Sequence, residues 1–237
     1  MRTFFCYSNL IPPFVRINKS GFVFMLMLLC SHTSIWGQNW DGGGAPDNSW
    51  CNDLNWNNDA QPTFEANIGS GYDVIIPAGC IVELRRIFVN QSSLTIAPNA
   101  ELTLANSIFD AIYLSEATLT NNGIINAIDN IGEDGLRIFN SVCHNNGLIN
   151  IDKLGEGSGI RITVGASLNN SGHINIGPDF GFDGNNGIEM SNGTLLNNLA
   201  NGQINILGVG SGWDGISDNS SGGTVNNAGT LCISEDV

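Results

Sequence analysis

Apolar residues alternate with polar ones in short runs along the second half of the chain. Each run contains a glycine, and apolar residues stand two and four positions after it. The apolar pairs are Ile125/Ala127, Ile149/Ile151, Ile174/Ile176, Ile204/Ile206 and Leu231/Ile233. Alternation with a period of two is typical of a β-strand that buries one face. No stretch after residue 37 keeps a helical period for three turns, so the pattern predicts short strands and excludes a helical solenoid.

These runs are internal repeats that keep a regular spacing. The aligned glycines are spaced by 24, 25, 30 and 27 residues, and they are Gly123, Gly147, Gly172, Gly202 and Gly229. A second motif (GLRI, GIRI, GIEM, GIS) recurs between them at Gly135, Gly159, Gly187 and Gly215. A repeat of this size cannot bury its own apolar face and must stack on its neighbours. We therefore predict an all-β protein: a right-handed, single-stranded parallel β-helix with coils of about 24–30 residues.

Asparagine occupies two fixed positions of the repeat. One lies two residues before the glycine in four of the five repeats, and the other lies between the two apolar residues in four of them, with Cys232 in the last. The asparagines are Asn121, Asn145, Asn170 and Asn227 at the first position and Asn126, Asn150, Asn175 and Asn205 at the second. Stacked asparagines can hydrogen-bond from coil to coil, as they do in cross-β ladders. Asn and Gly also tolerate the left-handed backbone that sharp corners require. The sequence thus predicts asparagine ladders along the solenoid.

The chain divides into three parts on composition. Weaker strand-like runs begin at Asp73 (DVIIPAG), so residues 73–237 are predicted to be β-helix repeats. Residues 38–72 are rich in Trp, Asn and Gly and lack strand alternation. Solenoids usually need a cap over their open end. We expect residues 38–72 to be that cap, and stacking of its tryptophans on carbohydrate is the alternative role.

Residues 1–37 have the pattern of a secretory signal peptide. Arg2, Arg16 and Lys19 precede the short apolar run 21–30, and Gly37 offers a small residue for cleavage before Gln38. The run is too short to span a bilayer, which needs about 20 apolar residues. We expect a secreted or cell-surface protein, cleaved near Gly37–Gln38. A lipid anchor on Cys30 is disfavoured by the bulky residue that precedes it.

The charge that remains after residue 37 is strongly negative. Five basic and 22 acidic residues remain, a formal charge of −17. Nucleic acid and anionic membranes recruit clusters of Lys and Arg, so neither is an expected partner. Polyanionic substrates are disfavoured for the same reason. Solubility outside the cell is the simpler explanation of the charge.

Four cysteines follow residue 37, and export would permit disulfides. Cys51 and Cys80 precede the repeats and are the candidate pair, which the sequence leaves open. Cys143 and Cys232 lie about four coils apart, at ~4.8 Å per coil, beyond the roughly 7 Å Cα limit of a disulfide. No zinc or redox motif is present in the sequence.

The opening of the mature part resembles a known group of proteins. Trp40, Trp50, Asn55-Trp56 and Pro62, followed by DVIIPAG at 73–79, resemble the start of many secreted bacterial β-helix repeat proteins, notably of the Bacteroidota. These are adhesin-like or autotransporter-passenger-like surface proteins, so the resemblance implies architecture and an extracellular place. This chain shows no C-terminal cap or sorting domain. We therefore expect a truncated chain, or one whose uncapped last coil associates end to end with a partner.

Acidic residues in the loops that precede the glycine of the second motif are the candidate metal ligands. They are Glu133, Asp134, Glu156, Asp183 and Asp214. Stacked coils would bring some of these oxygens within reach of one Ca²⁺ ion, although solvated loops are the simpler explanation. No other cofactor is expected.

Pectin lyases and polygalacturonases share the β-helix fold, and Arg161 is the one candidate base for a lyase. An outward column of Arg137, Arg161, Glu189 and Ser217 is also predicted, with Arg161 and Glu189 paired across coils.

We expect a non-catalytic extracellular β-helix, structural or adhesin-like, that binds glycan or a surface protein through its loop face. Phe180, Phe182 and Trp213 lie in the long inserts and are the candidate contact residues. The alternative is a polysaccharide-active lyase or hydrolase that uses the acidic loops.

Overall fold

The structure is a computed structural model in which Gly37–Val237 forms one compact unit. It describes residues 37–129, 131–152, 155, 157–177, 186–191, 193–209, 214–219 and 222–235. Residues 1–36 of the predicted signal peptide therefore lie outside the described residues. The same holds for the candidate contacts Phe180, Phe182 and Trp213 and for the candidate ligands Glu156 and Asp183.

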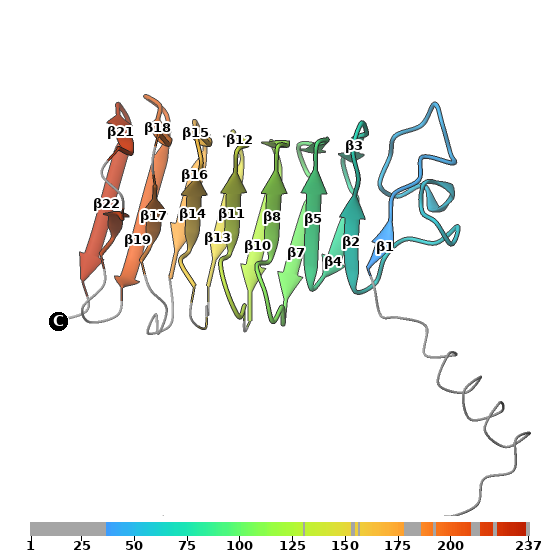
Figure 1. Ribbon diagram of the computed structural model, residues 1–237, viewed down its shortest axis with the longest axis horizontal. Helices are drawn as coiled ribbons and strands as arrows, with labels where there is room; N and C mark the ends of the chain where they lie inside the picture. The colour runs from blue at the N-terminus through green and yellow to red at the C-terminus, as the bar shows by residue number, and fades with distance from the viewer. Residues whose placement is uncertain are drawn as a thin grey trace, which may run out of the picture. The chain divides into compact units, whose positions relative to one another are not determined.

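Three parallel sheets form the walls of the molecule (Figure 1). Sheet A contains β1 (Gln38–Asn39), β2 (Glu65–Ile68), β5 (Arg86–Asn90), β8 (Ile112–Ser115), β11 (Leu136–Phe139), β14 (Ile160–Thr163), β17 (Ile188–Met190) and β20 (Ile216–Asp218). Sheet B contains β3 (Asp73–Ile76), β6 (Ser93–Ile96), β9 (Thr118–Asn121), β12 (Val142–Asn145), β15 (Ser167–Asn170), β18 (Leu195–Asn198) and β21 (Thr224–Asn227). Sheet C contains β4 (Ile81–Leu84), β7 (Glu101–Ala105), β10 (Ile124–Ile128), β13 (Leu148–Ile151), β16 (His173–Ile176), β19 (Gln203–Val209) and β22 (Thr230–Glu235).

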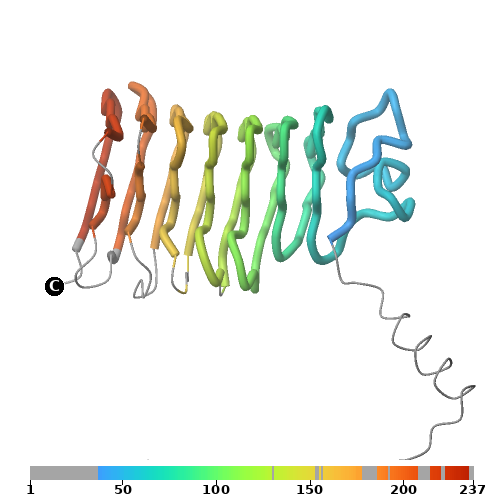
Figure 2. Tube along the Cα trace, in the orientation of Figure 1, coloured from blue at the N-terminus to red at the C-terminus, as the bar shows by residue number. Residues whose placement is uncertain are grey.

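Each coil supplies one strand to each sheet and then passes to the next coil, as the tube in Figure 2 shows. This confirms the predicted all-β parallel solenoid. The stacked coils begin earlier than predicted. β2 pairs with β5 and is part of the stack, although it lies inside residues 38–72, the segment expected to be the cap. The helix in the described part is a single 3-10 turn, Asp53–Asn55. No described helix is therefore long enough to cross a membrane.

The repeat glycines allow the coils to approach closely. A Cβ atom built on Gly147 would lie 2.1 Å from the carbonyl oxygen of Gly123, and one on Gly172 would lie 2.1 Å from that of Gly147. None of the five repeat glycines has a positive φ, so the expected left-handed corner is not their reason. Such corners are made elsewhere, for example at Asn99 and Asn140. Glycine is required here because backbone stacks directly on backbone.

The asparagines that precede these glycines form a ladder inside the solenoid. Each side-chain Nδ2 donates to Oδ1 of the next coil, and the distances along Asn121, Asn145, Asn170, Asn198 and Asn227 are 2.8, 2.8, 2.9 and 2.7 Å. The first four side chains are at most 2% exposed. Each also donates to a backbone carbonyl of the following coil, so the predicted ladder satisfies buried backbone as well.

The N-terminal end of the solenoid is covered by three tryptophans. Trp50 and Trp56 are completely buried, and Trp56 contacts Trp50 and Trp40 edge-on at ring distances of 4.6 and 5.1 Å. The backbone of Trp50 and Asn48 bonds to Ile75 on β3. A disulfide joins Cys51 to Cys80. The expected Trp-rich cap is thus attached to the first coil by backbone bonds and a covalent bond.

Replacing Asn170 with Ala tests the inner ladder. The substitution removes bonds to Asn145, Asn198 and the carbonyl of Gln203 in a dry interior. Each buried group left without a partner costs about 1–3 kcal/mol, so we expect a loss of roughly 3 kcal/mol or more in the free energy of unfolding. Urea unfolding followed by circular dichroism measures it.

Asn175→Ala is the matched control. Asn175 makes two similar side-chain bonds, to Asn150 and Asn205, but on the half-buried outer face. Water can replace those bonds, so the loss should stay near ~1 kcal/mol. Equal losses in the two variants would contradict a special role of the inner ladder.

Candidate functional site

The outer face of sheet A carries a continuous column of aromatic and charged side chains. Register places Phe88, Tyr113, Arg137, Arg161, Glu189 and Ser217 next to one another on successive strands. The rings of Phe88 and Tyr113 lie 5.2 Å apart, and the guanidinium of Arg137 lies 5.3 Å from the Tyr113 ring. The predicted column from Arg137 to Ser217 is confirmed, and it extends two coils further toward the N-terminus than the repeats indicated.

A second column lies at the bend before each sheet A strand. We call it the bend column, and it consists of Asp110, Asp134, Ser158, Asn186 and Asp214. Side-chain oxygens of this column accept backbone N–H groups of the next coil: Asp110 from Asp134 at 3.1 Å, Asp134 from Ser158 at 2.8 Å, and Asn186 from Asp214 at 3.0 Å. The carboxylates of Asp110 and Asp134 therefore serve the stacking of coils.

The two columns meet at Arg161. Its Nε donates to Asp134 at 2.7 Å, and its Nη1 donates to Glu189 at 3.2 Å, which confirms the predicted pairing of Arg161 with Glu189. The other carboxylate oxygen of Glu189 accepts from the Ser158 hydroxyl at 2.9 Å. Asp134 is only 1% exposed, so solvent does not reach the end of this network that Asp134 forms.

This geometry decides what the predicted metal ligands can do. Asp134 is occupied by Arg161 and a backbone N–H, whereas Glu133 and Asp214 are exposed to solvent. Glu156 and Asp183 lie outside the described residues. In the part of the chain that the structure describes, no three His, Cys, Asp or Glu side chains gather to hold a metal ion. A calcium site at these loops stays a prediction.

Burial controls the protonation of the acidic pair. The pKa of Asp110 is raised to about 6 by burial and by the nearby carboxylate of Asp134. Burial also raises the pKa of Asp134, against the opposing effect of Arg161. Burial lowers the pKa of Arg161, but Asp134 and Glu189 outweigh it and the net change is upward. Arg161 therefore stays protonated, which is unfavourable for the general base of a lyase.

Asp110 is a residue that the motif search missed. Its coil has Ala111 where later coils have the glycine of the second motif, so alignment on glycine left that coil out. The signal was nevertheless present, because Asp110-Ala111-Ile112 repeats the order of Asp134-Gly135-Leu136. Its guanidinium neighbour is Arg137, whose Nη1 lies 3.8 Å from Asp110 Oδ2.

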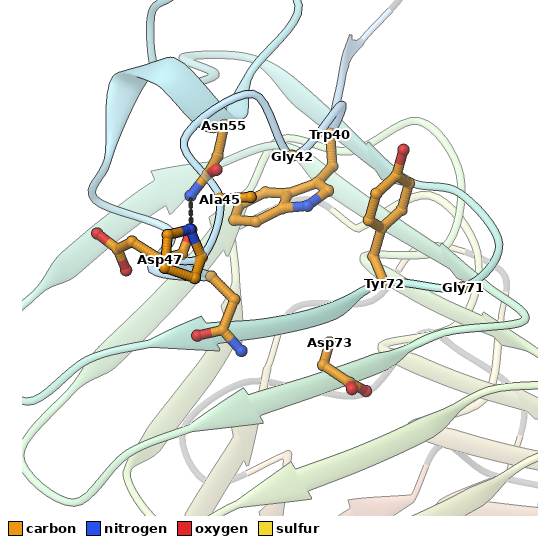
Figure 3. Close-up of a pocket in the computed structure, with 10 residues that line it drawn as sticks. Trp40, Gly42, Ala45, Asp47, Asn55, Gly71, Tyr72 and Asp73 are labelled. Carbon is orange, nitrogen blue, oxygen red and sulfur yellow. Dashed lines mark hydrogen bonds between the residues drawn. The ribbon is translucent and has the colours of Figure 1, made fainter.

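A pocket lies where the cap meets the first coil (Figure 3). Its volume is about 220 Å³. It is lined by Trp40, Gly42, Ala45, Pro46, Asp47, Asn48, Asn55, Gly71, Tyr72 and Asp73. The sequence had indicated tryptophans in this segment. The residues that complete the pocket, Gly71, Tyr72 and Asp73, lie much further along the chain, where β3 begins.

The walls of this cap pocket are held in place by buried contacts. Asn55 is completely buried, and its Nδ2 donates to the carbonyl oxygens of Asp47 and Ser49 at 2.8 and 3.0 Å. The Tyr72 ring lies against Gly42, where a Cβ atom would come within 3.2 Å of the ring. Gly42 also has a φ of +69°, so glycine is required there twice over.

The fold and the two columns define the molecule as a capped parallel β-solenoid. Comparison with family models, curated proteins and solved structures finds no match for this chain. Any function therefore has to be argued from its own residues.

Replacing Asp110 with Asn tests the buried acid. The folded-state pKa of about 6 exceeds the ordinary 3.8, so folding favours the protonated form. For this group, stability is highest below about pH 4 and falls as the pH rises through 6. Asn keeps the acceptor for the Asp134 N–H without a charge, as Asn186 does for Asp214. We expect Asp110→Asn to stabilise the protein above pH 6 by up to about 2–3 kcal/mol and to flatten this part of the profile.

Urea unfolding at a series of pH values from 4 to 8 measures the effect. Asp214→Asn removes one charge from an exposed position of the same column and is the matched control. A profile that keeps its slope in Asp110→Asn would show that Asp110 is not the group responsible.

Proposed function

We propose that the protein is an exported, non-catalytic, adhesin-like β-solenoid that binds a neutral sugar residue in the cap pocket. The observation that carries the proposal is the lining of that pocket. It combines two aromatic rings, two carboxylates and two amides with no cationic side chain. Binding is assigned to the cap and not to the loop face because the candidate loop aromatics lie outside the described residues.

The chemistry of the pocket suits hydroxyl groups. Trp40, Tyr72 and Pro46 supply apolar surface, against which the C–H face of a sugar ring can pack. Asp73 accepts a bond from Ser93 through one carboxylate oxygen, and its exposed side chain offers the other oxygen to a ligand. Carboxylates repel anions and accept hydrogen bonds from hydroxyl groups. A neutral sugar is therefore favoured over an acidic one, in keeping with the charge of −17.

The size and shape of the pocket limit the ligand. Typical sites for drug-sized ligands have volumes of about 300–1,000 Å³, and this pocket is smaller. It suits one sugar ring, such as the end of a glycan chain.

A role without catalysis is supported by the placement of the acids and bases. General acid–base chemistry needs titratable groups that can reach a substrate. In the wall of sheet A, Arg161 instead pairs with Asp134, and the carboxylate of Asp110 accepts the backbone N–H of Asp134. The carboxylates at the cap pocket have no basic partner among its lining residues.

Sugar binding is tested on the compact unit 37–237 with a panel of neutral monosaccharides, uronic acids and the corresponding polysaccharides. We expect neutral sugars to change the tryptophan fluorescence and to raise the melting temperature, since a ligand of the native state must stabilise it. Asp73→Asn should weaken binding by about tenfold or more, because a charged hydrogen bond contributes roughly 1.5–3 kcal/mol. Tyr72→Ala should weaken binding to a similar extent.

Tyr113→Ala is the control, because Tyr113 is also a half-exposed aromatic residue but lies on sheet A. It should leave the affinity unchanged. The same samples are assayed for new reducing ends and for unsaturated products. Turnover of any polysaccharide, or binding that is insensitive to Asp73 and Tyr72, would overturn the proposal.

Export is tested separately by expressing the full chain in a secreting bacterial host. The leader pattern supports cleavage after Gly37, so we expect the protein outside the cytoplasm with Gln38 as its first residue. Edman sequencing or mass spectrometry of the recovered N-terminus identifies the cleavage position. Retention in the cytoplasm with residues 1–37 attached would contradict export.

A further inference from the structure

Positive charge on this acidic chain gathers in one region. After residue 37 the chain has five basic residues against 22 acidic ones, and four of the five are arginines. All four belong to sheet A or to the bend before one of its strands: Arg85, Arg86, Arg137 and Arg161. Arg161 is neutralised by Asp134 and Glu189. The remaining arginines lie on or beside β5 and β11, where they form a local exception to the charge of −17.

Two of these arginines approach the same coil from opposite sides. Arg86 comes from the coil before β8, and its guanidinium lies 4.9 Å from the ring centre of Phe109, just before β8. Arg137 comes from the coil after β8, and its guanidinium lies 5.3 Å from the ring centre of Tyr113 on β8. The ring of Phe88 lies 5.2 Å from that of Tyr113. Cations and aromatic rings therefore alternate over three neighbouring coils.

The bend before β8 adds an apolar projection to this region. Residues 106–111 join β7 to β8, whereas Arg85 alone joins β4 to β5. The longer bend extends past its neighbour, so Ile108 is 75% exposed and Phe109 is 42% exposed. We call the whole region the arginine–aromatic face, and it consists of Arg86, Phe88, Ile108, Phe109, Tyr113 and Arg137.

The guanidinium groups of this face have unused hydrogen-bond donors. A guanidinium has five N–H donors, and the buried Nε atoms of Arg86 and Arg137 have no hydrogen-bond partner among the described residues. Arg86 forms no ion pair with a described carboxylate, although Glu65 is its register partner on β2. Arg137 reaches Asp110 only at 3.8 Å, which is too long for a hydrogen bond. Arginine can contact a ring and hold a carboxylate at the same time, so this face lacks a matching acid.

We propose that the arginine–aromatic face docks a second protein, through a segment that carries Asp or Glu beside apolar side chains. The carboxylates of the segment bind Arg86 and Arg137, and its apolar side chains pack against Ile108 and Phe109. Arginine and aromatic residues are enriched at the centres of protein interfaces and contribute most of their binding energy. The face shares no residue with the cap pocket, so this docking does not depend on sugar binding.

The chemistry of the face favours a protein segment over other anionic ligands. A sugar ring packs against an open aromatic face, but guanidinium groups already lie over Phe109 and Tyr113. Nucleic acid carries a charge on every phosphate, so the strongly negative remainder of the chain would repel it. A protein segment can supply one or two carboxylates without further charge. It also provides the apolar contact that the exposed side chain of Ile108 requires.

Docking is tested on unit 37–237 with synthetic peptides of about ten residues that alternate Glu with Leu. An extended chain rises ~3.4 Å per residue, so such a peptide spans the distance from β5 to β11. We expect it to bind, with an affinity that falls as the salt concentration rises. Peptides that alternate Ser or Lys with Leu should not bind. Fluorescence anisotropy of labelled peptides measures the dissociation constants, and equal affinities for the Glu and Ser peptides would refute the proposal.

Arg86→Gln should weaken binding of the Glu peptide by roughly tenfold, because it removes a charged hydrogen bond. Ile108→Ser should weaken it to a similar extent, and both positions face the outside, so the fold is kept. Ile81→Glu is the matched control. It changes the net charge by the same amount as Arg86→Gln, at a 67% exposed residue on β4 of sheet C, and should leave the affinity unchanged.

A charge reversal separates a direct contact from the general field of the protein. Arg86→Glu should lose the Glu peptide and gain binding of the Lys peptide, a gain that Ile81→Glu should not show. Binding that responds equally to Arg86→Gln and Ile81→Glu would contradict a contact at Arg86.

Two further measurements identify a different occupant. Oligogalacturonic acid that binds more tightly than the Glu peptide, with the same loss in Arg86→Gln, would assign the face to an acidic glycan. Self-association of the unit in analytical ultracentrifugation, lost in Arg86→Gln, would assign it to a second copy of the chain. Either result would replace the protein segment proposed here.

Discussion

The inner asparagines of this solenoid are satisfied by the coils above and below them, and this constraint accounts for much of the rest of the structure. A coil has only two neighbours, and its interior is dry. Asparagine meets the requirement because its amide both donates and accepts, so one residue type can repeat without limit along a column. The ladder from Asn121 to Asn227 satisfies buried backbone carbonyls as well. Such a ladder requires coils in close contact, which explains why a glycine follows soon after each ladder asparagine, four residues later for Asn198 and two residues later for the others.

These requirements are local and periodic, so the sequence predicts them well. The alternation at Ile149 and Ile151 and the asparagine at Asn145 each reappear at the expected register, and the parallel solenoid follows. The bends were harder to predict, because long-range contacts decide them. Asp134 was expected to face solvent as a metal ligand, but Arg161 of the next coil and the Ser158 N–H bury it. Asp110 was missed because an alanine interrupts the glycine motif.

The cap pocket is a second feature that the sequence predicts only in part. Its tryptophans are visible in the sequence, but whether they cover an end or bind a ligand depends on exposure, which composition does not reveal. Trp50 and Trp56 are completely buried and serve the core. The ring of Trp40 contacts Trp56 and also lines the pocket beside Tyr72. One segment thus provides both the end cover and the wall of the pocket.

The cap and the coils satisfy their polar groups in different ways. At the N-terminal end of the solenoid, aromatic side chains pack over the first coil, and Trp56 Nε1 donates to the carbonyl oxygen of Trp50 within the cap itself. Along the coils, each inner asparagine instead donates to the next coil, as Asn198 does to Asn227. The cap therefore ends the column of coils by apolar packing, whereas the coils continue it by a polar ladder in which every member depends on its neighbour.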